Sequence, residues 1–255
     1  MQEFIQVVEV SPRDGIQNEK KVLSTLKKEE LISRAIDSGF KRIEVTSFVN
    51  PKKIPQMFDT DELISSLSKY KKKDVKLIGL VLNEKGFNRA LASSIDVINY
   101  VVVASDTFSI RNQGASTLDN LKVLEKIYAK SNSKIEITTT IGASFGCPFE
   151  GEISSKKLLL IIEQISKIGL NEICLADTIG VATPKEIKVK LKAIKSSFPN
   201  LKQSFIVREE CPILSFKSHK IYRIVSMTLS AQGVILYGVK KSRSTSEYGA
   251  ISLRP

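Results

Sequence analysis

Several residue types are scarce in this 255-residue sequence, and each scarcity excludes a class of protein. Trp is absent, aromatic residues make up 7%, and there is one histidine. The three cysteines, Cys147, Cys174 and Cys211, lie far apart, which argues against a disulfide framework and a Cys-x-x-Cys metal or redox site. No stretch reaches the roughly 18 apolar residues of a membrane helix. We therefore expect a cytoplasmic protein without a membrane partner and without a presequence.

The charge of the chain is strongly positive, with a net charge of +12 and a pI near 9.5. Such a charge raises the question of a nucleic-acid partner, because clustered Lys and Arg displace counterions from phosphates. Here the lysines are scattered along predicted helices, for example over residues 185–192. We therefore expect a solvated basic surface, some of which serves the phosphates of a small ligand, and no nucleic-acid partner.

Short β-branched runs alternate with helical segments along the first 200 residues. Six strands are predicted: Ile5–Val10, Arg42–Val45, Val75–Val81, Asp96–Val103, Ile135–Thr140 and Glu172–Leu175. The segments between them carry apolar residues at helical spacing, and Gly39 and Gly169 follow two of these segments, where a helix-ending glycine belongs. The repeated order of strand and helix indicates a parallel sheet in an α/β protein.

The polar residues follow the strands at their carboxyl ends, as at Arg13, Glu44 and Asp177. In a (β/α)8 TIM barrel these ends meet at one mouth, so residues distant in sequence share one site. A doubly wound sheet is the alternative, but no Gly-x-Gly-x-x-Gly or phosphate-loop motif follows any strand. We expect the barrel, incomplete or irregular at its carboxyl-terminal end, where the alternation of helix and strand weakens after Pro199.

Four motifs carry a family resemblance. They are VEVSPRDGIQNEK at residues 8–20, RIEVTSFVNPKKIPQMFD at 42–59, GASFGCPFEGEIS at 142–154 and CLADTIGVATP at 174–184. Together they resemble the 3-hydroxy-3-methylglutaryl-CoA (HMG-CoA) lyases, in order and in spacing, over residues 3–200. The wider metal-dependent aldol family, which includes synthases of 2-hydroxy acids, shares the Arg-Asp-Gly start. The phrases TSFVNPKKIPQM and GCPFEG favour the lyases.

The resemblance implies a retro-aldol cleavage of a CoA thioester to acetyl-CoA and acetoacetate, with Mg²⁺ or Mn²⁺ as cofactor. By resemblance, Arg13 is catalytic and holds the thioester oxygen, and Asp14 is a metal ligand. Glu44 and Asp177 match carboxylates in the family's pocket, which implies that they are catalytic too, and Thr178 matches a substrate contact. Negative charge develops on two oxygens in this reaction, which is why a guanidinium and a cation suit it.

Simpler interpretations of these residues stay open. Arg13 and Asp14 could form an exposed ion pair in a turn, Glu44 could be a structural partner of an arginine, and Asp177 could cap the turn that follows it. By resemblance Cys147 lines the substrate pocket, although a lone cysteine is most often a small buried hydrophobic residue. Glu9 also matches a family carboxylate, and we expect it to support the site from outside.

The resemblance ends abruptly near residue 200. The family's His-x-His-Asp, its Gly-Gly-Cys-Pro-Tyr loop and its Asn ligand are absent: SFIVREEC stands at 204–211 and SAQGVILYGVKKS at 230–242. His219 lies off the motif. We divide the chain into a lyase-like barrel, residues 1–204, and a divergent tail, residues 205–255, and hypothesise a reading-frame shift. Asp14 alone is a poor cation cage, since Mg²⁺ takes about six donors, so we expect the cation to be held weakly, if at all.

Three hypotheses for the function follow. The first is an HMG-CoA lyase by descent, whose activity in this form the missing ligands leave open. The second is a non-catalytic barrel that binds CoA esters or a partner protein. The third is a related synthase that makes a 2-hydroxy acid. By resemblance a homodimer is expected.

Overall fold

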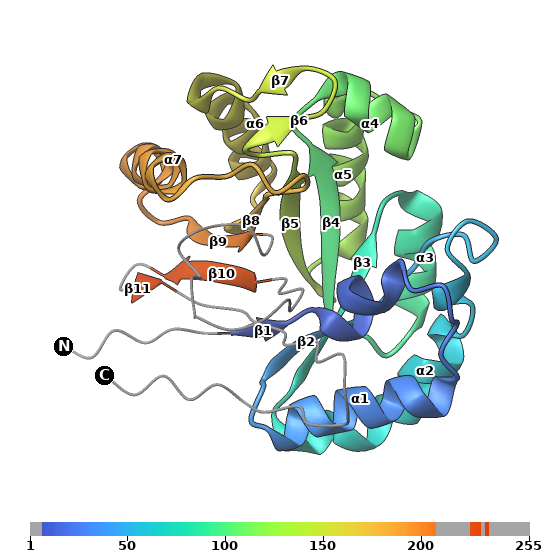
Figure 1. Ribbon diagram of the computed structural model, residues 1–255. Coiled ribbons are helices and arrows are strands. Elements are labelled where there is room, and N and C mark those ends of the chain that lie inside the picture. Colours follow the sequence, from blue (N-terminus) through green and yellow to red (C-terminus); the bar gives the residue numbers. More distant parts are fainter. Residues whose placement is uncertain (1–6, 208–224, 231–232, 235–255) are drawn as a thin grey trace.

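A computed structural model of the chain describes residues 7–207, 225–230 and 233–234. Its main sheet runs in the order β1-β2-β3-β4-β5-β8-β9-β10-β11 (Figure 1). The first seven of these strands are parallel. They are β1 (Val8–Glu9), β2 (Arg42–Ser47), β3 (Lys76–Val81), β4 (Val97–Val103), β5 (Glu136–Gly142), β8 (Glu172–Ala176) and β9 (Lys202–Val207).

The helices cover the outer face of the curled sheet (Figure 1). They are α1 (Thr25–Asp37), α2 (Thr60–Ser66), α3 (Glu84–Ala92), α4 (Asp106–Gln113), α5 (Thr117–Ser131), α6 (Ser155–Ile168) and α7 (Pro184–Ser197). Short 3-10 helices span Pro55–Met57 and Leu67–Lys73, and a small hairpin joins β6 (Gly146–Cys147) to β7 (Gly151–Glu152). The result is an incomplete (β/α)8 barrel of seven parallel strands, as the sequence predicts.

Local sequence signals set the ends of several helices. Ser154 and Thr183 accept hydrogen bonds from the backbone N–H three residues later, and so begin α6 and α7. Gly169 ends α6 with a φ of +103°, a conformation that favours glycine. None of the helices in the described ranges is long and apolar enough to cross a membrane.

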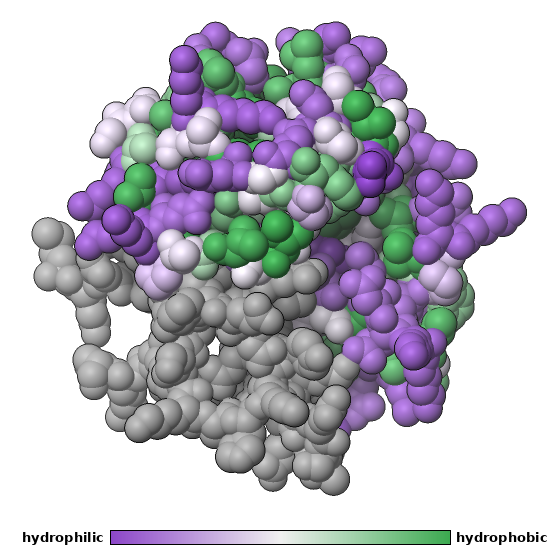
Figure 2. Space-filling view, turned by 45° about the horizontal axis from the view of Figure 1, so that its top comes forward, coloured by the Kyte–Doolittle hydropathy of each residue, from purple (hydrophilic) through white to green (hydrophobic). Residues whose placement is uncertain are grey.

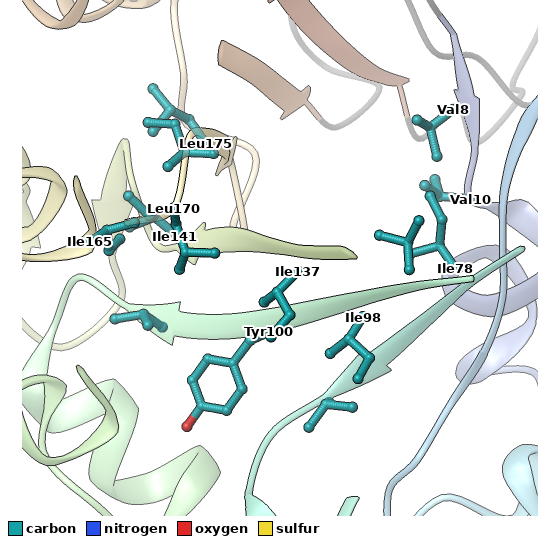
Figure 3. Packing of buried hydrophobic residues seen from close by; sticks show 14 of the residues in the cluster. Val8, Val10, Ile78, Ile98, Tyr100, Ile137, Ile141, Ile165, Leu170 and Leu175 are labelled. Carbon is teal, nitrogen blue, oxygen red and sulfur yellow. The ribbon is translucent and has the colours of Figure 1, made fainter. Parts of the chain in front are cut away.

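Each strand of the sheet sends alternate side chains to two different environments. Ile98 and Tyr100 of β4 point to the helices, and the Tyr100 hydroxyl donates to Asn120 of α5. Most of the apolar core lies on this outer face, and Figure 3 draws part of the core. The inner face encloses a cavity that is lined both by apolar side chains, such as Val8, Val10 and Ile78, and by polar or charged ones. The barrel interior is therefore the polar side of the sheet.

An ion pair spans the interior near the amino ends of the strands. Arg42, the first residue of β2, donates to both carboxylate oxygens of Glu172, the first residue of β8, at 2.9 and 3.2 Å. Bidentate pairing of this kind fixes geometry as well as charge. It joins two strands that are not neighbours in the sheet, so it supports the curl.

The last strands of the sheet reverse direction. β10 (Val225–Ser230) pairs antiparallel with β9, and β11 (Gly233–Val234) pairs antiparallel with β10. β10 also lies beside β1 (Figure 1). β9 was missed as a strand, because the polar residues Lys202, Gln203 and Ser204 at its start hide the β-branched pattern.

Candidate active site

Arg13 and Asp14 lie on a single π-helical turn, Ser11–Gly15, that directly follows β1. Pro12 at the start of the turn fixes φ and needs no hydrogen bond there. The N–H groups of Arg13 and Asp14 both donate to the Val10 carbonyl, at 3.2 and 2.8 Å. The turn therefore holds both side chains at the carboxyl end of the sheet, and such turns occur frequently at functional sites.

The Arg13 guanidinium is buried and pairs with two carboxylates. Its Nε and Nη2 donate to Oε1 of Glu44, and its Nη1 donates to Oδ1 of Asp14 at 2.8 Å. Burial alone would disfavour the charge, but the carboxylates of Glu44 and Asp14 outweigh it and raise the pKa of Arg13 above its usual value. The structure therefore contains both the arginine partnership of Glu44 and a fixed guanidinium at the mouth.

The Glu44 carboxylate continues into a hydrogen-bonded chain inside the barrel. Its Oε2 accepts a hydrogen bond from Asn99 Nδ2 at 2.8 Å, and Asn99 Oδ1 accepts one from Thr140 at 2.9 Å. All three side chains are buried and line the interior cavity. Neither Asn99 nor Thr140 was predicted from the sequence. The signal was a single amide in the apolar run VINYVVV of β4.

Glu9 is a second buried carboxylate beside this site. Its Oε1 accepts a hydrogen bond from the Ser11 N–H at 2.8 Å. Burial raises its pKa to about 7, although the hydrogen bonds from Ser11 and Val10 act in the opposite direction. Glu9 therefore titrates near neutral pH, within the strand that leads to Arg13.

Asp177 and Thr178 lie just after β8, at the same end of the sheet as Arg13. The two Asp177 carboxylate oxygens accept hydrogen bonds from the N–H groups of Val181 and Ala182, at 3.0 and 3.1 Å. The Thr178 hydroxyl accepts one from the Ala143 N–H at 2.8 Å. Both side chains therefore hold loops at the mouth, and the simpler interpretation of Asp177 as a cap describes its contacts.

Cys147 is buried in the β6–β7 hairpin after β5. Its Sγ donates to the Ser105 hydroxyl at 2.9 Å and accepts a hydrogen bond from the Phe149 N–H at 3.4 Å. Ser105 also caps α4 by accepting from the Phe108 N–H. The thiol therefore links the hairpin to the start of α4. The structure brings Arg13, Asp14 and Glu44 into direct contact, whereas the hydrogen bonds of Cys147, Asp177 and Thr178 are with other segments.

A divalent cation needs several oxygen or nitrogen donors aimed at one point. The Asp14 side chain is 35% exposed, and one of its oxygens is engaged by Arg13. The Glu44 oxygens are taken by Arg13 and Asn99. Across the ranges that the structure describes, no group of three or more His, Cys, Asp or Glu side chains could hold an ion. These residues by themselves do not fit a cation cage.

The fold and the polar mouth define a (β/α)8-barrel protein of the kind whose sites lie at the carboxyl ends of the strands. The model of the HMGL-like family matches residues 4–207, and the chain belongs to this family. The match ends with the last residue of β9.

Curated relatives with similar sequences are carbon–carbon lyases. Residue identity is 35% over 196 residues with the mitochondrial hydroxymethylglutaryl-CoA lyase of Macaca fascicularis, covering 76% of this chain and 60% of that protein. It is 34% over 209 residues with the (R)-citramalyl-CoA lyase of Chloroflexus aurantiacus, covering 78% and 66%. The chain thus spans less than two thirds of the length of these relatives.

Solved structures agree with this assignment. An HMG-CoA lyase from Acinetobacter baumannii, in complex with coenzyme A and 3-methylmalate, superposes with a TM-score of 0.77 at 34% identity, covering 84% of this chain and 70% of that one. The carboxyl transferase domain of Rhizobium etli pyruvate carboxylase reaches a TM-score of 0.58 at 15% identity and shares the fold. The prediction of an HMG-CoA lyase-like barrel is confirmed at the level of the family.

Proposed function

We propose that the chain is a carbon–carbon lyase that cleaves 3-hydroxy-3-methylglutaryl-CoA to acetyl-CoA and acetoacetate. The observation that carries the proposal is the Arg13 guanidinium, which Glu44 fixes at the mouth of an HMGL-like barrel. Curated relatives of this chain are lyases of CoA esters. The complex of the Acinetobacter protein with coenzyme A supports a CoA thioester as the ligand.

Arg13 has the geometry to stabilise the enolate. The contacts with Glu44 and Asp14 use one N–H on each of Nε, Nη1 and Nη2. A guanidinium carries five N–H groups, so one on each Nη is left to donate to the thioester oxygen. As the C2–C3 bond breaks, the tertiary hydroxyl loses its proton and its oxygen becomes the ketone of acetoacetate. The bonding electrons form the enolate, whose carbon then takes up a proton to give acetyl-CoA.

The other residues have supporting roles in this proposal. Glu44 holds Arg13, Asp177 holds the loop at Val181 and Ala182 next to the reacting groups, and Thr178 and Cys147 border the thioester. Asp14 is the one family ligand that we assign to a divalent cation, Mg²⁺ or Mn²⁺, which the described residues alone would hold weakly. A cation of this kind would stabilise the alkoxide when bound.

The test is acetoacetate formation by the purified chain with HMG-CoA and added Mn²⁺. We expect turnover in the chain itself and its loss in Arg13→Lys, because an ammonium lacks the planar fork that Glu44 holds. Lys27→Gln, on the solvent side of α1, is the matched control and should retain activity. CoA-ester binding without acetoacetate would replace the lyase by a non-catalytic binding barrel.

A second substrate is favoured by the (R)-citramalyl-CoA lyase relative. The same retro-aldol cleavage of (R)-citramalyl-CoA would give acetyl-CoA and pyruvate. Assaying both thioesters side by side decides between them, and condensation of acetyl-CoA with a 2-oxo acid would favour the related synthase.

We further propose a cytoplasmic location, a homodimer, no nucleic-acid partner, and a division into a barrel, residues 1–204, and a divergent tail, residues 205–255. Sedimentation of the purified chain tests the dimer. Sequencing the DNA around codons 198–210 tests the reading-frame shift, since an intact frame in a transcript under selection excludes it.

A further inference from the structure

The Glu44 carboxylate is held from the side opposite Arg13 by an amide that spans two strands. Glu44 lies on β2 and faces Ile78 on the neighbouring strand β3, whose side chain has no polar group. Asn99 comes from β4, one strand further, and its Nδ2 reaches Glu44 Oε2 at 2.8 Å across the barrel interior. Backbone pairing of neighbouring strands therefore does not account for this side-chain contact.

The direction of these hydrogen bonds is determined. The Asn99 oxygen cannot face Glu44, because both groups would be acceptors. Its Nδ2 therefore points to Glu44, and the Oδ1 that remains accepts from the Thr140 hydroxyl at 2.9 Å. Thr140 donates to Asn99, Asn99 donates to Glu44, and Arg13 donates to Glu44 from the other side. The carboxylate is an acceptor at both oxygens and has one orientation.

Burial makes the loss of a hydrogen bond at the Glu44 carboxylate costly. Glu44 is 2% exposed, and Asn99 and Thr140 are also buried. A carboxylate oxygen at such a place that lost its donor would turn toward another one or draw in water. Either movement would shift Oε1, to which two nitrogens of Arg13 are bound.

We infer that Asn99, held by Thr140, is a positioning residue that fixes Glu44 and through it the Arg13 guanidinium. The inference rests on the proposed function, because Arg13 gains a catalytic meaning only if it binds the thioester oxygen. In this proposal Asn99 contacts neither Arg13 nor the reacting atoms, so it acts by fixing the orientation of the Glu44 carboxylate.

The experiment compares Asn99→Leu and Thr140→Val with Thr139→Val as the matched control. Leu has nearly the size of Asn and lacks both polar groups, and Val replaces Thr with the same shape. Thr139 is the neighbouring residue of β5, is fully buried, and its hydroxyl has no hydrogen-bond partner among the described residues. Its replacement removes a hydroxyl from the same strand without touching the chain to Glu44.

The first measurement needs no turnover. The Nε–H signal of Arg13 is followed by NMR in the protein without substrate, and Arg13→Lys identifies it by its disappearance. We expect hydrogen exchange at Nε to accelerate roughly tenfold or more in Asn99→Leu, since a hydrogen bond to a charged group is lost behind Glu44. A smaller acceleration is expected in Thr140→Val, and none in Thr139→Val.

The second measurement separates positioning from folding and from the proposed function. We expect kcat for thioester cleavage to fall in Asn99→Leu with KM nearly unchanged. If the starting protein shows no turnover, the lyase proposal fails, and the NMR comparison still decides the role of Asn99. An Arg13 signal that is identical in shift and exchange in folded Asn99→Leu and Thr140→Val would overturn the inference. If Asn99→Leu does not fold, the isosteric Thr140→Val decides alone.

Discussion

Arg13 and Glu44 form a buried ion pair in which two guanidinium nitrogens donate to one carboxylate oxygen. The two residues are 31 positions apart and come from the turn after β1 and from the middle of β2. Their side chains are 9% and 3% exposed. Each is the main charge partner of the other in an interior that would otherwise disfavour both charges.

Removing one residue of this ion pair should therefore lower the stability of the folded protein. Glu44→Gln leaves the Arg13 charge with Asp14 as its only ionic partner among the described residues, and we expect a loss of about 3 kcal/mol in the free energy of unfolding. Urea denaturation measures it. Glu30→Gln is the control, because the pair of Glu30 with Arg34 is on the exposed face of α1 and should contribute less than about 1 kcal/mol. Equal losses in the two variants would contradict the assigned burial.

Glu9 predicts a specific pH dependence of stability. Its pKa is about 7 in the folded protein and near 4.5 in the unfolded chain, so the folded state binds the proton more tightly between these values. Its contribution to stability should fall as pH rises from about 4.5 to 7, by roughly 3 kcal/mol in all. The stability of Glu9→Gln should change less over this pH range, and at pH 8 this variant should be more stable than the unmodified chain. Parallel stability curves for the two proteins would show that Glu9 is not buried in this way.

The buried pair of Lys28 and Asp59 predicts that the stability losses from replacing each residue are strongly non-additive. Lys28 is 1% exposed and donates to Asp59 at 2.6 Å, and also to the Gln56 carbonyl. Lys28→Met and Asp59→Leu should each destabilise the folded protein by about 3 to 5 kcal/mol, because each leaves a buried charge without its partner. The double variant should lose much less than the sum. Thermal and urea unfolding of all four proteins gives the coupling, and additive losses would rule out a direct pair.

Introducing two histidines should not raise turnover. In the family that the sequence resembles, the seventh strand ends in His-x-His, and the corresponding residues here are Ile206 and Arg208, of which Arg208 lies outside the described residues. The double variant Ile206→His/Arg208→His still lacks the cysteine and asparagine of the later loop. Acetoacetate formation with added Mn²⁺ should therefore match that of the unmodified chain. A clear gain in acetoacetate formation would show that the sequence departs from the family pattern at another position.

The fold was largely predictable because the outer faces of the strands follow simple rules. Strands are present in all six predicted segments, and Gly169 ends its helix as expected, but β1 spans only Val8–Glu9, and the described residues Val7 and Val10 lie outside it. β9 was not recognised, since Lys202, Gln203 and Ser204 break the continuous apolar run that is expected of a strand buried on both sides. The antiparallel pairing of β10 with β9 depends on the path of the whole chain.

The proximity of Arg13, Asp14 and Glu44 was predictable, because a motif placed them at neighbouring strand ends. Contacts that cross β3 or join loops could not be inferred in the same way. Asn99 reaches Glu44 only because the sheet curls, and the loop contacts of Asp177 depend on the backbone path after β8. Such pairings arise from curvature, which residue spacing does not encode.

The reversed direction of β10 has a consequence for what the later part of the chain can reach. Val225 pairs with Val207 and Leu229 with Gln203, so β10 starts level with the carboxyl ends of the parallel strands and finishes level with their amino ends. A parallel strand in that position would deliver the next stretch of chain to the rim occupied by Arg13. Here β10 ends at the floor of the barrel, level with Gln203, and the sheet continues from there into β11, which pairs antiparallel with β10.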